Sequence, residues 1–106
     1  MVISGGVNIY PAEIEAAILA FPGVQDCAVF GIPDEEYGEA LCAHVEPQPG
    51  SMLTAGEVRA FLLAKLARYK VPKTIELRRD LPREDSGKIF KRELRAPYWE
   101  HVGRQI

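Results

Sequence analysis

The sequence is poor in the residues that mark disulfide-rich, secreted or membrane-spanning proteins. Its 106 residues include only two cysteines, Cys27 and Cys42, which excludes a scaffold built on disulfides. No apolar run approaches the roughly 20 residues that a transmembrane helix needs, and the first residues lack the features of a secretory signal. We therefore expect a cytoplasmic protein without a transmembrane segment, in which both cysteines are reduced core thiols.

Basic residues are absent from the first half of the chain. Residues 1–50 carry eight acidic side chains and no Lys or Arg, whereas residues 51–106 carry seven acidic side chains and all thirteen Lys and Arg. The net charge of −2 argues against a nucleic-acid partner bound through overall basicity. The cations of the second half fit either a surface that meets phosphates or an ordinary solvated face.

Residues for metal binding or nucleophilic catalysis are also sparse. His44 and His101 are far apart, with no second His or Cys at the spacing of metal-ligand motifs, so we expect no metal site. Ser4, Ser51 and Ser86 lack the motif that presents a nucleophilic serine, so no Ser-His-acid arrangement is predicted.

Local patterns in the first half predict a loop, a helix and two strands. Residues 1–8 are Gly-rich and predict a loop or turn in which glycines adopt positive φ. Pro11 suits the first position of a helix that ends at Pro22-Gly23. Strands over 24–32 and 40–45 are too close in sequence for a helical crossover, so they should pair antiparallel. The second is apolar on both faces except at His44, which predicts a central strand.

The second half predicts further helices, a strand and a polar loop. Thr54 and Glu57 have the spacing of a capping box, which begins a helix that ends at Val71-Pro72 at the latest. A strand follows over 74–77, then a polar loop over 78–88 and a short helix over 91–95 closed by Pro97. The fold class is therefore α+β: one domain with a small antiparallel or mixed sheet of about three strands, covered by two or three helices.

The loop Leu81-Pro82-Arg83-Glu84-Asp85-Ser86-Gly87-Lys88 contains the most suggestive cation. It is not a Walker A loop, because Pro82 and Ile89 stand where that motif needs Gly and Ser or Thr. Two interpretations of Lys88 remain open. It is either a solvated loop lysine or a mobile cation that meets an anionic transition state.

Four segments together resemble a known family. Residues 3–15 resemble the motif that opens the C-terminal domain of acyl-CoA synthetases, and residues 81–94 resemble the motif near its end. Residues 29–34 and 69–73 match in kind and order between them, so the resemblance covers nearly the whole chain. The family is that of the AMP-forming adenylating enzymes: acyl- and aryl-CoA ligases, peptide-synthetase adenylation domains and luciferases.

The resemblance implies an acid-thiol ligase reaction in two halves. A carboxylate attacks the α-phosphate of ATP to give an acyl-adenylate and pyrophosphate, and the thiol of CoA then displaces AMP. Residues 1–106 would form the mobile C-terminal lid domain, whose partner is the large N-terminal domain that holds ATP, Mg²⁺ and the carboxylic acid. That large domain is absent from this sequence, so we expect no bound cofactor and no ligase activity from residues 1–106 alone.

The resemblance also assigns roles to individual residues. Lys88 corresponds to the adenylation lysine, a flexible ammonium that offsets the repulsion between carboxylate and phosphate. The Gly-Gly loop would enter the active site in a second pose and form the channel for the pantetheine arm. The predicted CoA-binding residues are Gly5, Gly6, Tyr37, Tyr69 and Lys73. Val71 departs from relatives that carry Arg at its position.

Other interpretations remain open at this point. A stand-alone binding or regulatory module could keep the same fold without catalysing the reaction. A peptide-synthetase fragment is another alternative, although Asn8-Ile9-Tyr10-Pro11 has the wording of acyl-CoA ligases and residues 98–106 show no carrier-protein domain. The sequence leaves the acyl specificity undetermined.

Overall fold

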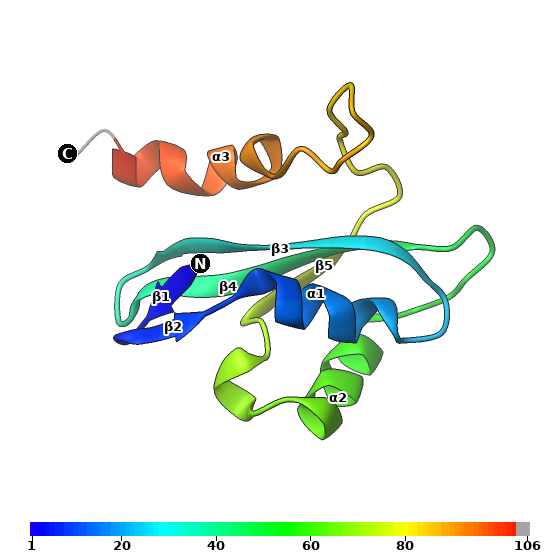
Figure 1. Cartoon of the computed structure of the whole chain (residues 1–106), viewed down its shortest axis with the longest axis horizontal. Coiled ribbons are helices and arrows are strands. Elements are labelled where there is room, and N and C mark those ends of the chain that lie inside the picture. The colour runs from blue at the N-terminus through cyan, green and yellow to red at the C-terminus, as the bar shows by residue number, and fades with distance from the viewer. Residues whose placement is uncertain (104–106) are drawn as a thin grey trace.

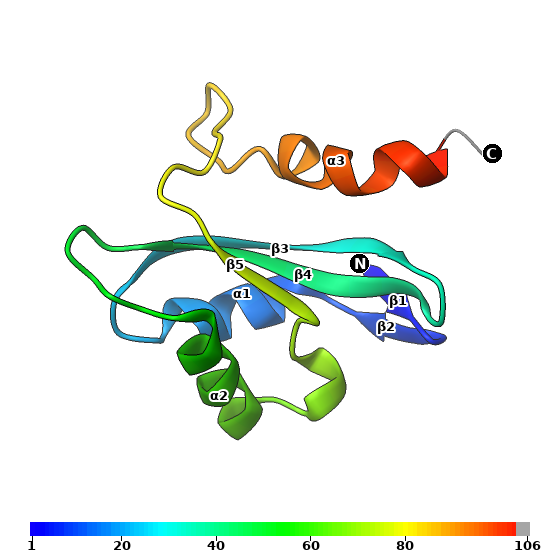
Figure 2. The same ribbon diagram turned by 180° about the vertical axis from the view of Figure 1, so that it is seen from behind.

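A three-stranded sheet separates two layers of helices (Figure 1). The computed structural model describes residues 1–103, so the end of the tail, residues 104–106, lies outside the described part. The sheet comprises β3 (Val24–Asp34), β4 (Gly38–Pro47) and β5 (Thr74–Leu77). One face carries α1 (Pro11–Leu19) and α2 (Ala55–Lys65), and the other carries α3 (Lys91–Gly103), as Figure 2 shows from behind. The α+β fold class is confirmed.

The sheet is mixed, with β4 at its centre. Strands β3 and β4 form a long antiparallel hairpin in which Phe30 faces Cys42, as the short connection predicts. Strand β5 pairs parallel with β4, placing Glu76 opposite His44. Helix α2 supplies the crossover that a parallel pair requires. The predicted central position of the second strand is therefore confirmed.

Alternating residues of the sheet build two separate cores. Val29, Ala43 and Val45 pack with α1 and α2 on one face, whereas Phe30 and Cys42 pack with α3 on the other. This alternation follows from the period of two in a β-strand. Both Cys27 and Cys42 are buried free thiols, as predicted.

The helix starts follow the sequence signals. Pro11 occupies the start of α1. At α2 the backbone N–H of Glu57 donates to Thr54 Oγ1 at 3.1 Å, and the N–H of Thr54 donates to Glu57 Oε1 at 2.9 Å, which completes the predicted capping box. No helix within residues 1–103 combines the length and apolar character needed to cross a membrane.

The structure corrects the prediction at both ends of the chain. The predicted turn with positive φ at Gly5 and Gly6 is confirmed, but the residues on both sides of it form a hairpin of β1 (Val2–Ser4) and β2 (Val7–Ile9). These strands are too short for the alternation of apolar and polar residues to reveal them. The predicted helix closure at Pro97 is wrong, because α3 continues through it to Gly103. Residues on both sides of the proline hold the helix to the sheet: Leu94 is buried, and Trp99 Nε1 donates to the Gly31 carbonyl at 2.9 Å.

Candidate functional site

A cleft of about 430 Å³ lies where two turns and a short helix meet. It is bordered by the β1–β2 turn, by the turn between β3 and β4, and by the 3₁₀ helix η1 (Arg68–Lys70) with the residues after it. The structure brings four of the five predicted CoA-binding residues to this cleft, namely Gly5, Tyr37, Tyr69 and Lys73. Gly6 belongs to the same turn as Gly5 but does not line the cleft.

The two glycines form the tip of the β1–β2 hairpin. Their φ angles are +58° at Gly5 and +84° at Gly6, values that L-residues with a side chain rarely adopt. The N–H of Gly5 donates to the Tyr37 carbonyl at 2.9 Å, so the two turns are joined directly. A Cβ on Gly5 would lie 3.1 Å from Tyr37 Cδ1, whereas a Cβ on Gly6 would meet nothing within 4 Å. Position 5 therefore requires glycine both for its positive φ and for the close approach of the Tyr37 ring, whereas position 6 requires glycine only for its positive φ.

Asp34 holds two of the cleft residues, Tyr37 and Lys73, although it does not line the cleft itself. Its Oδ1 accepts hydrogen bonds from the backbone N–H groups of Glu36 and Tyr37, both at 2.9 Å. Its Oδ2 accepts from Lys73 Nζ at 2.7 Å. The hydrogen bond from Lys73 is the main cause of a lowered pKa at Asp34, and the same bond raises the pKa of Lys73. Lys73 is thus a fixed cation at the mouth of the cleft.

Contacts with two helices hold the segment that carries Tyr69 and Lys73. Lys70 Nζ lies 2.9 Å from Glu13 Oε2 on α1. From α2, Arg59 donates to the carbonyl oxygens of Pro72 and Lys73 at 2.7 and 3.0 Å. The backbone of this segment is therefore fixed while the aromatic ring of Tyr69 remains exposed.

Six further residues line the cleft besides those predicted to bind CoA: Ser4, Val7, Ala40, Leu41, Arg68 and Val71. Arg68 belongs to the cluster of basic residues in the second half, but nothing in its spacing separates it from its solvated neighbours. Val71 packs partly against the core and presents an apolar side to the cleft. The cleft therefore combines two aromatic rings, an apolar wall and two cations.

Lys88 lies on a different part of the molecule. Residues 83–89 form a tight hairpin loop. The backbones of Arg83 and Ile89 form an isolated antiparallel β-bridge, and the N–H of Glu84 donates to the Lys88 carbonyl at 2.8 Å. Gly87 has a φ of +91° at its turn. Lys88 itself is exposed, and no ion pair among the described side chains, those of residues 1–100, involves it.

Arg83 ties this loop to the edge of the sheet. Its Nη2 lies 2.8 Å from Asp26 Oδ2 and 3.4 Å from Glu46 Oε1, and its Nη1 donates to the Gly87 carbonyl at 3.0 Å. The base of the loop is therefore anchored, and the ammonium of Lys88 extends from it.

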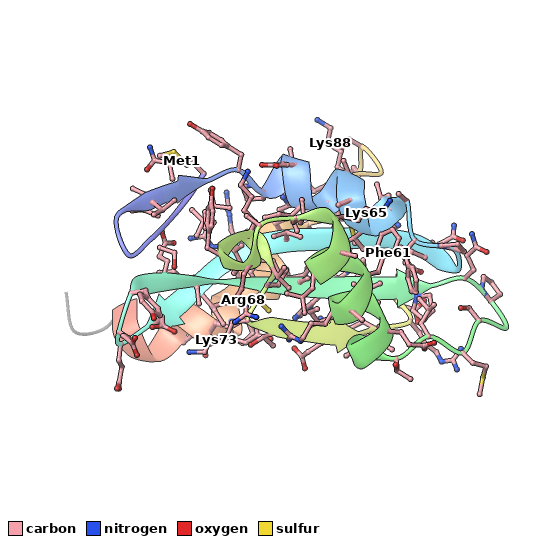
Figure 3. All side chains as sticks on the ribbon, turned by 90° about the horizontal axis from the view of Figure 1, so that it is seen from below. Met1, Phe61, Lys65, Arg68, Lys73 and Lys88 are labelled. Carbon is pink, nitrogen blue, oxygen red and sulfur yellow. The ribbon has the colours of Figure 1, made fainter. Side chains whose placement is uncertain are left out.

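The two predicted functional regions are well separated. Figure 1 shows the loop of residues 83–89 at the opposite end of the sheet from the β1–β2 turn, and Figure 3 shows Lys88 and Lys73 at different edges of the molecule. The structure brings the predicted CoA-binding residues together but does not bring Lys88 to them. A small ligand cannot touch both regions at once in this arrangement.

Comparisons with known proteins agree on the domain type. The family described as "AMP-binding enzyme C-terminal domain" matches residues 13–88. A feruloyl-CoA synthase from Amycolatopsis is 50% identical over 92% of this chain, and a fatty acid–[acyl-carrier-protein] ligase, ScoC, from Streptomyces coeruleorubidus is 39% identical over 99%. The crystal structure of ATP-bound MatB from Rhodopseudomonas palustris superposes with a TM-score of 0.87 at 41% identity over 92% of the chain.

The chain corresponds to only part of each relative. It spans 20% of the feruloyl-CoA synthase, 20% of the ScoC ligase and 20% of the MatB chain. The similarity therefore concerns one domain of proteins about five times longer.

Proposed function

This chain belongs to the family of AMP-binding enzyme C-terminal domains, and from that premise we propose that it is the mobile domain of an AMP-forming acyl-CoA synthetase. Its partner is a large N-terminal domain that binds ATP, Mg²⁺ and a carboxylic acid. The reaction joins the acid to CoA and yields AMP and pyrophosphate. In one pose this domain supplies Lys88 for adenylation, and in the other it supplies the CoA cleft for thioester formation.

The observation that carries the proposal is the convergence of Gly5, Tyr37, Tyr69 and Lys73 on one cleft. The glycine tip leaves room for a thin thiol-bearing arm to pass close to the backbone. Tyr69 and Tyr37 are both more than half exposed, which suits stacking on a base or packing against a pantetheine chain. The ammonium of Lys73 suits a nucleotide phosphate, and Arg68 lines the same cleft.

The separate position of Lys88 supports an alternation between two poses. A lysine that serves the first half-reaction must approach the carboxylate and the α-phosphate, whereas the glycine turn serves the second. Since both cannot face one active site together, the domain has to rotate between the steps. An ammonium placed at the developing charge is worth about 3–4 kcal/mol of barrier, by analogy with a single donor to an oxyanion.

The acyl acceptor is either free CoA or a carrier protein. Both present a pantetheine thiol, and the ScoC relative is named as a ligase for an acyl-carrier protein. CoA differs by its nucleotide phosphates, for which the cations of the cleft provide contacts. We therefore favour CoA as the acceptor, with the carrier protein as the second candidate.

A domain exchange tests the proposal directly. The matching C-terminal fifth of the Amycolatopsis feruloyl-CoA synthase is replaced by residues 1–106, and pyrophosphate release and thioester formation are measured separately. We expect both half-reactions in the chimera. Lys88→Ala should slow adenylation by about 10²- to 10³-fold and spare thioester formation from supplied feruloyl-adenylate. Lys65→Ala, an exposed lysine on α2, is the matched control and should leave both unchanged.

Two results would contradict the proposal. One is an equal loss of both half-reactions in Lys88→Ala while the chimera remains folded. The other is pyrophosphate release by residues 1–106 alone, supplied with ATP, CoA and a panel of carboxylic acids. Higher activity with a phosphopantetheinylated carrier protein than with CoA would favour the second acceptor.

A further inference from the structure

One cluster of reactive side chains lies outside both functional regions and has no part in the proposed reaction. Cys42 and His44 are two residues apart on β4 and therefore point to the same face of the sheet. Glu76 on β5 stands directly opposite His44. A sulfur, a nitrogen and an oxygen from these three residues all lie within 4.8 Å of one another.

The separations between these atoms approach those of a metal site. His44 Nε2 lies 3.0 Å from Glu76 Oε2. The hydroxyl of Tyr98, reaching down from α3, lies 2.6 Å from the same Glu76 oxygen and 3.1 Å from His44 Nε2. Ligand atoms of a tetrahedral zinc ion lie about 3.3–3.7 Å apart, given bond lengths of about 2.0–2.3 Å. The Tyr98 hydroxyl also interacts with the Cys42 thiol, so it must move aside, and the sulfur must move closer to the other two ligand atoms, to admit an ion.

We propose that Cys42, His44 and Glu76 form a binding site for a divalent cation of the zinc class. A thiolate, an imidazole and a carboxylate make up a mixed S, N and O ligand set, which suits Zn²⁺ or Co²⁺ and disfavours Mg²⁺ and Ca²⁺. Three protein ligands leave a fourth position for water or for the Tyr98 hydroxyl. The thiolate and carboxylate charges would balance the two positive charges of the ion.

The surroundings provide an access path. A cleft of about 720 Å³ between the sheet and the start of α3 is lined by His44, Glu76 and Tyr98. Cys42 and His44 are buried, whereas the Glu76 side chain is half exposed. An ion can therefore arrive from solvent at Glu76 and reach the two buried ligands behind it.

Binding requires further local changes besides the movement of the Tyr98 hydroxyl. The Cys42 thiol must lose its proton to solvent as the metal–sulfur bond forms, so affinity should increase with pH. His44 must carry its remaining proton on Nδ1 to coordinate through Nε2. Arg78 Nη1 lies 3.5 Å from Nδ1, and its exposed side chain must turn away to allow this. The cost of these changes sets the affinity but leaves the ligand set intact.

Spacing along the chain predicts no metal site, and this proposal departs from that prediction. A Cys and a His two residues apart do not form a metal motif by themselves. The third ligand comes from a strand more than thirty residues later, placed opposite His44 by the parallel pairing of β4 and β5.

Anaerobic titration of the metal-free 106-residue chain with Co²⁺ tests the site, because cobalt–thiolate bonds give a near-ultraviolet charge-transfer absorption. We expect this band to saturate at one Co²⁺ per chain and to disappear when Zn²⁺ is added. Cys42→Ser should abolish the band. Glu76→Gln, which changes a half-exposed side chain, should weaken Co²⁺ binding by at least about tenfold.

The matched control is Cys27→Ser, which removes the other thiol and should leave the titration unchanged. Circular dichroism of each variant without metal establishes that it is folded, and Glu76→Gln serves if Cys42→Ser is not. The proposal is overturned if the parent chain gives no saturable band. It is also overturned if the band is lost in folded Cys27→Ser, or if it survives in folded Cys42→Ser or at full affinity in Glu76→Gln.

Discussion

The ammonium of Lys73 lies 2.7 Å from the carboxylate of Asp34, across the mouth of the proposed CoA cleft. The other oxygen of Asp34 accepts from the backbone of the turn that carries Tyr37, and the carbonyl of Tyr37 accepts from Gly5. A continuous chain of hydrogen bonds therefore joins three segments that are far apart in the sequence. Asp34 was not selected from the sequence, yet it positions two of the residues that were.

Two substitutions of Asp34 should distinguish its hydrogen bonds to the Tyr37 turn from its ion pair with Lys73. In the feruloyl-CoA synthase chimera, we expect Asp34→Asn to raise the KM for CoA about two- to fivefold, the scale of an exposed ion pair, and to leave adenylation unchanged. Asp34→Ala should have a larger effect, because it also removes the acceptor that orders the Tyr37 turn. Glu35→Gln is the control from the same turn. Equal effects of all three variants would contradict the positioning role.

The two glycines of the hairpin tip should respond differently to substitution. Gly5→Ala and Gly6→Ala each force a side chain into positive φ, which costs about 1–2 kcal/mol. Gly5→Ala also pushes against the Tyr37 ring, so it should destabilise the chain more. Urea unfolding of the 106-residue chain measures the difference.

Gly56→Ala supplies the control for those substitutions. Gly56 lies in α2, and a Cβ added there would approach Thr54 Oγ1 no more closely than 3.9 Å, an ordinary van der Waals contact. Alanine there should stabilise the chain by about 0.4–1 kcal/mol. If all three alanines changed stability alike, the conformational argument would be refuted.

Arg83 should influence adenylation through the loop that carries Lys88. Arg83→Ala removes contacts to Asp26, Glu46 and the Gly87 carbonyl, so the loop loses its anchor. We expect slower pyrophosphate release in the chimera, by about tenfold or more, with little change in thioester formation from supplied adenylate. A loss confined to the thioester step would place Arg83 in the other half-reaction and contradict this assignment.

Pro97 lies inside α3, where it lacks the N–H that would donate to Glu93. Pro97→Ala restores a donor and a stronger helix former, and the gain should exceed the loss of proline's restraint on the unfolded chain. A net gain of about 1 kcal/mol corresponds to a rise in Tm of about 4–8 °C for a domain of this size. Far-ultraviolet circular dichroism measures it. An unchanged or lower Tm would show that the proline ring contributes packing that alanine lacks.

Burial should make Cys27 unreactive in the folded chain. Burial, reinforced by the nearby Glu15 and Asp26 carboxylates, raises the pKa of the Cys27 thiol to about 12. In a Cys42→Ala background, alkylation by iodoacetamide should stay slow up to about pH 9, whereas the urea-unfolded chain should react readily above about pH 8. Between the unfolded pKa near 9 and the folded value, only the unfolded chain loses this proton, so stability should fall as pH rises. Rapid alkylation of the folded chain at pH 8 would contradict this account.

Sequence signals that span only a few residues were sufficient to predict much of the fold. The capping box at Thr54 and Glu57, Pro11 at the start of α1 and the short connection between β3 and β4 all depend on neighbours in the chain. The resemblance of whole segments added the family, which the comparisons confirm. It also predicted four of the residues that line the cleft, namely Gly5, Tyr37, Tyr69 and Lys73, although their roles remain proposals.

Where sequence reasoning failed, a distant segment supplied the stabilising contact. The helix containing Pro97 persists because Leu94 and Trp99 pack on the sheet, and the strands of the first hairpin are three residues each. The sequence alone could not distinguish Arg68 from the other surface cations, because the role of its side chain depends on the cleft that it lines.

The sequence by itself determined most of the helices and strands and the family, because those depend on local pattern and on motif. It also predicted residues for the proposed chemistry. Only the tertiary structure decided which of these residues meet. Hydrogen bonds from Asp34 join the parts of the proposed CoA cleft, and the length of the sheet keeps Lys88 away from it. The parallel pairing of β4 with β5 sets Glu76 beside His44. Such juxtapositions arise from packing between segments that are far apart in the chain, and no spacing along the sequence records them.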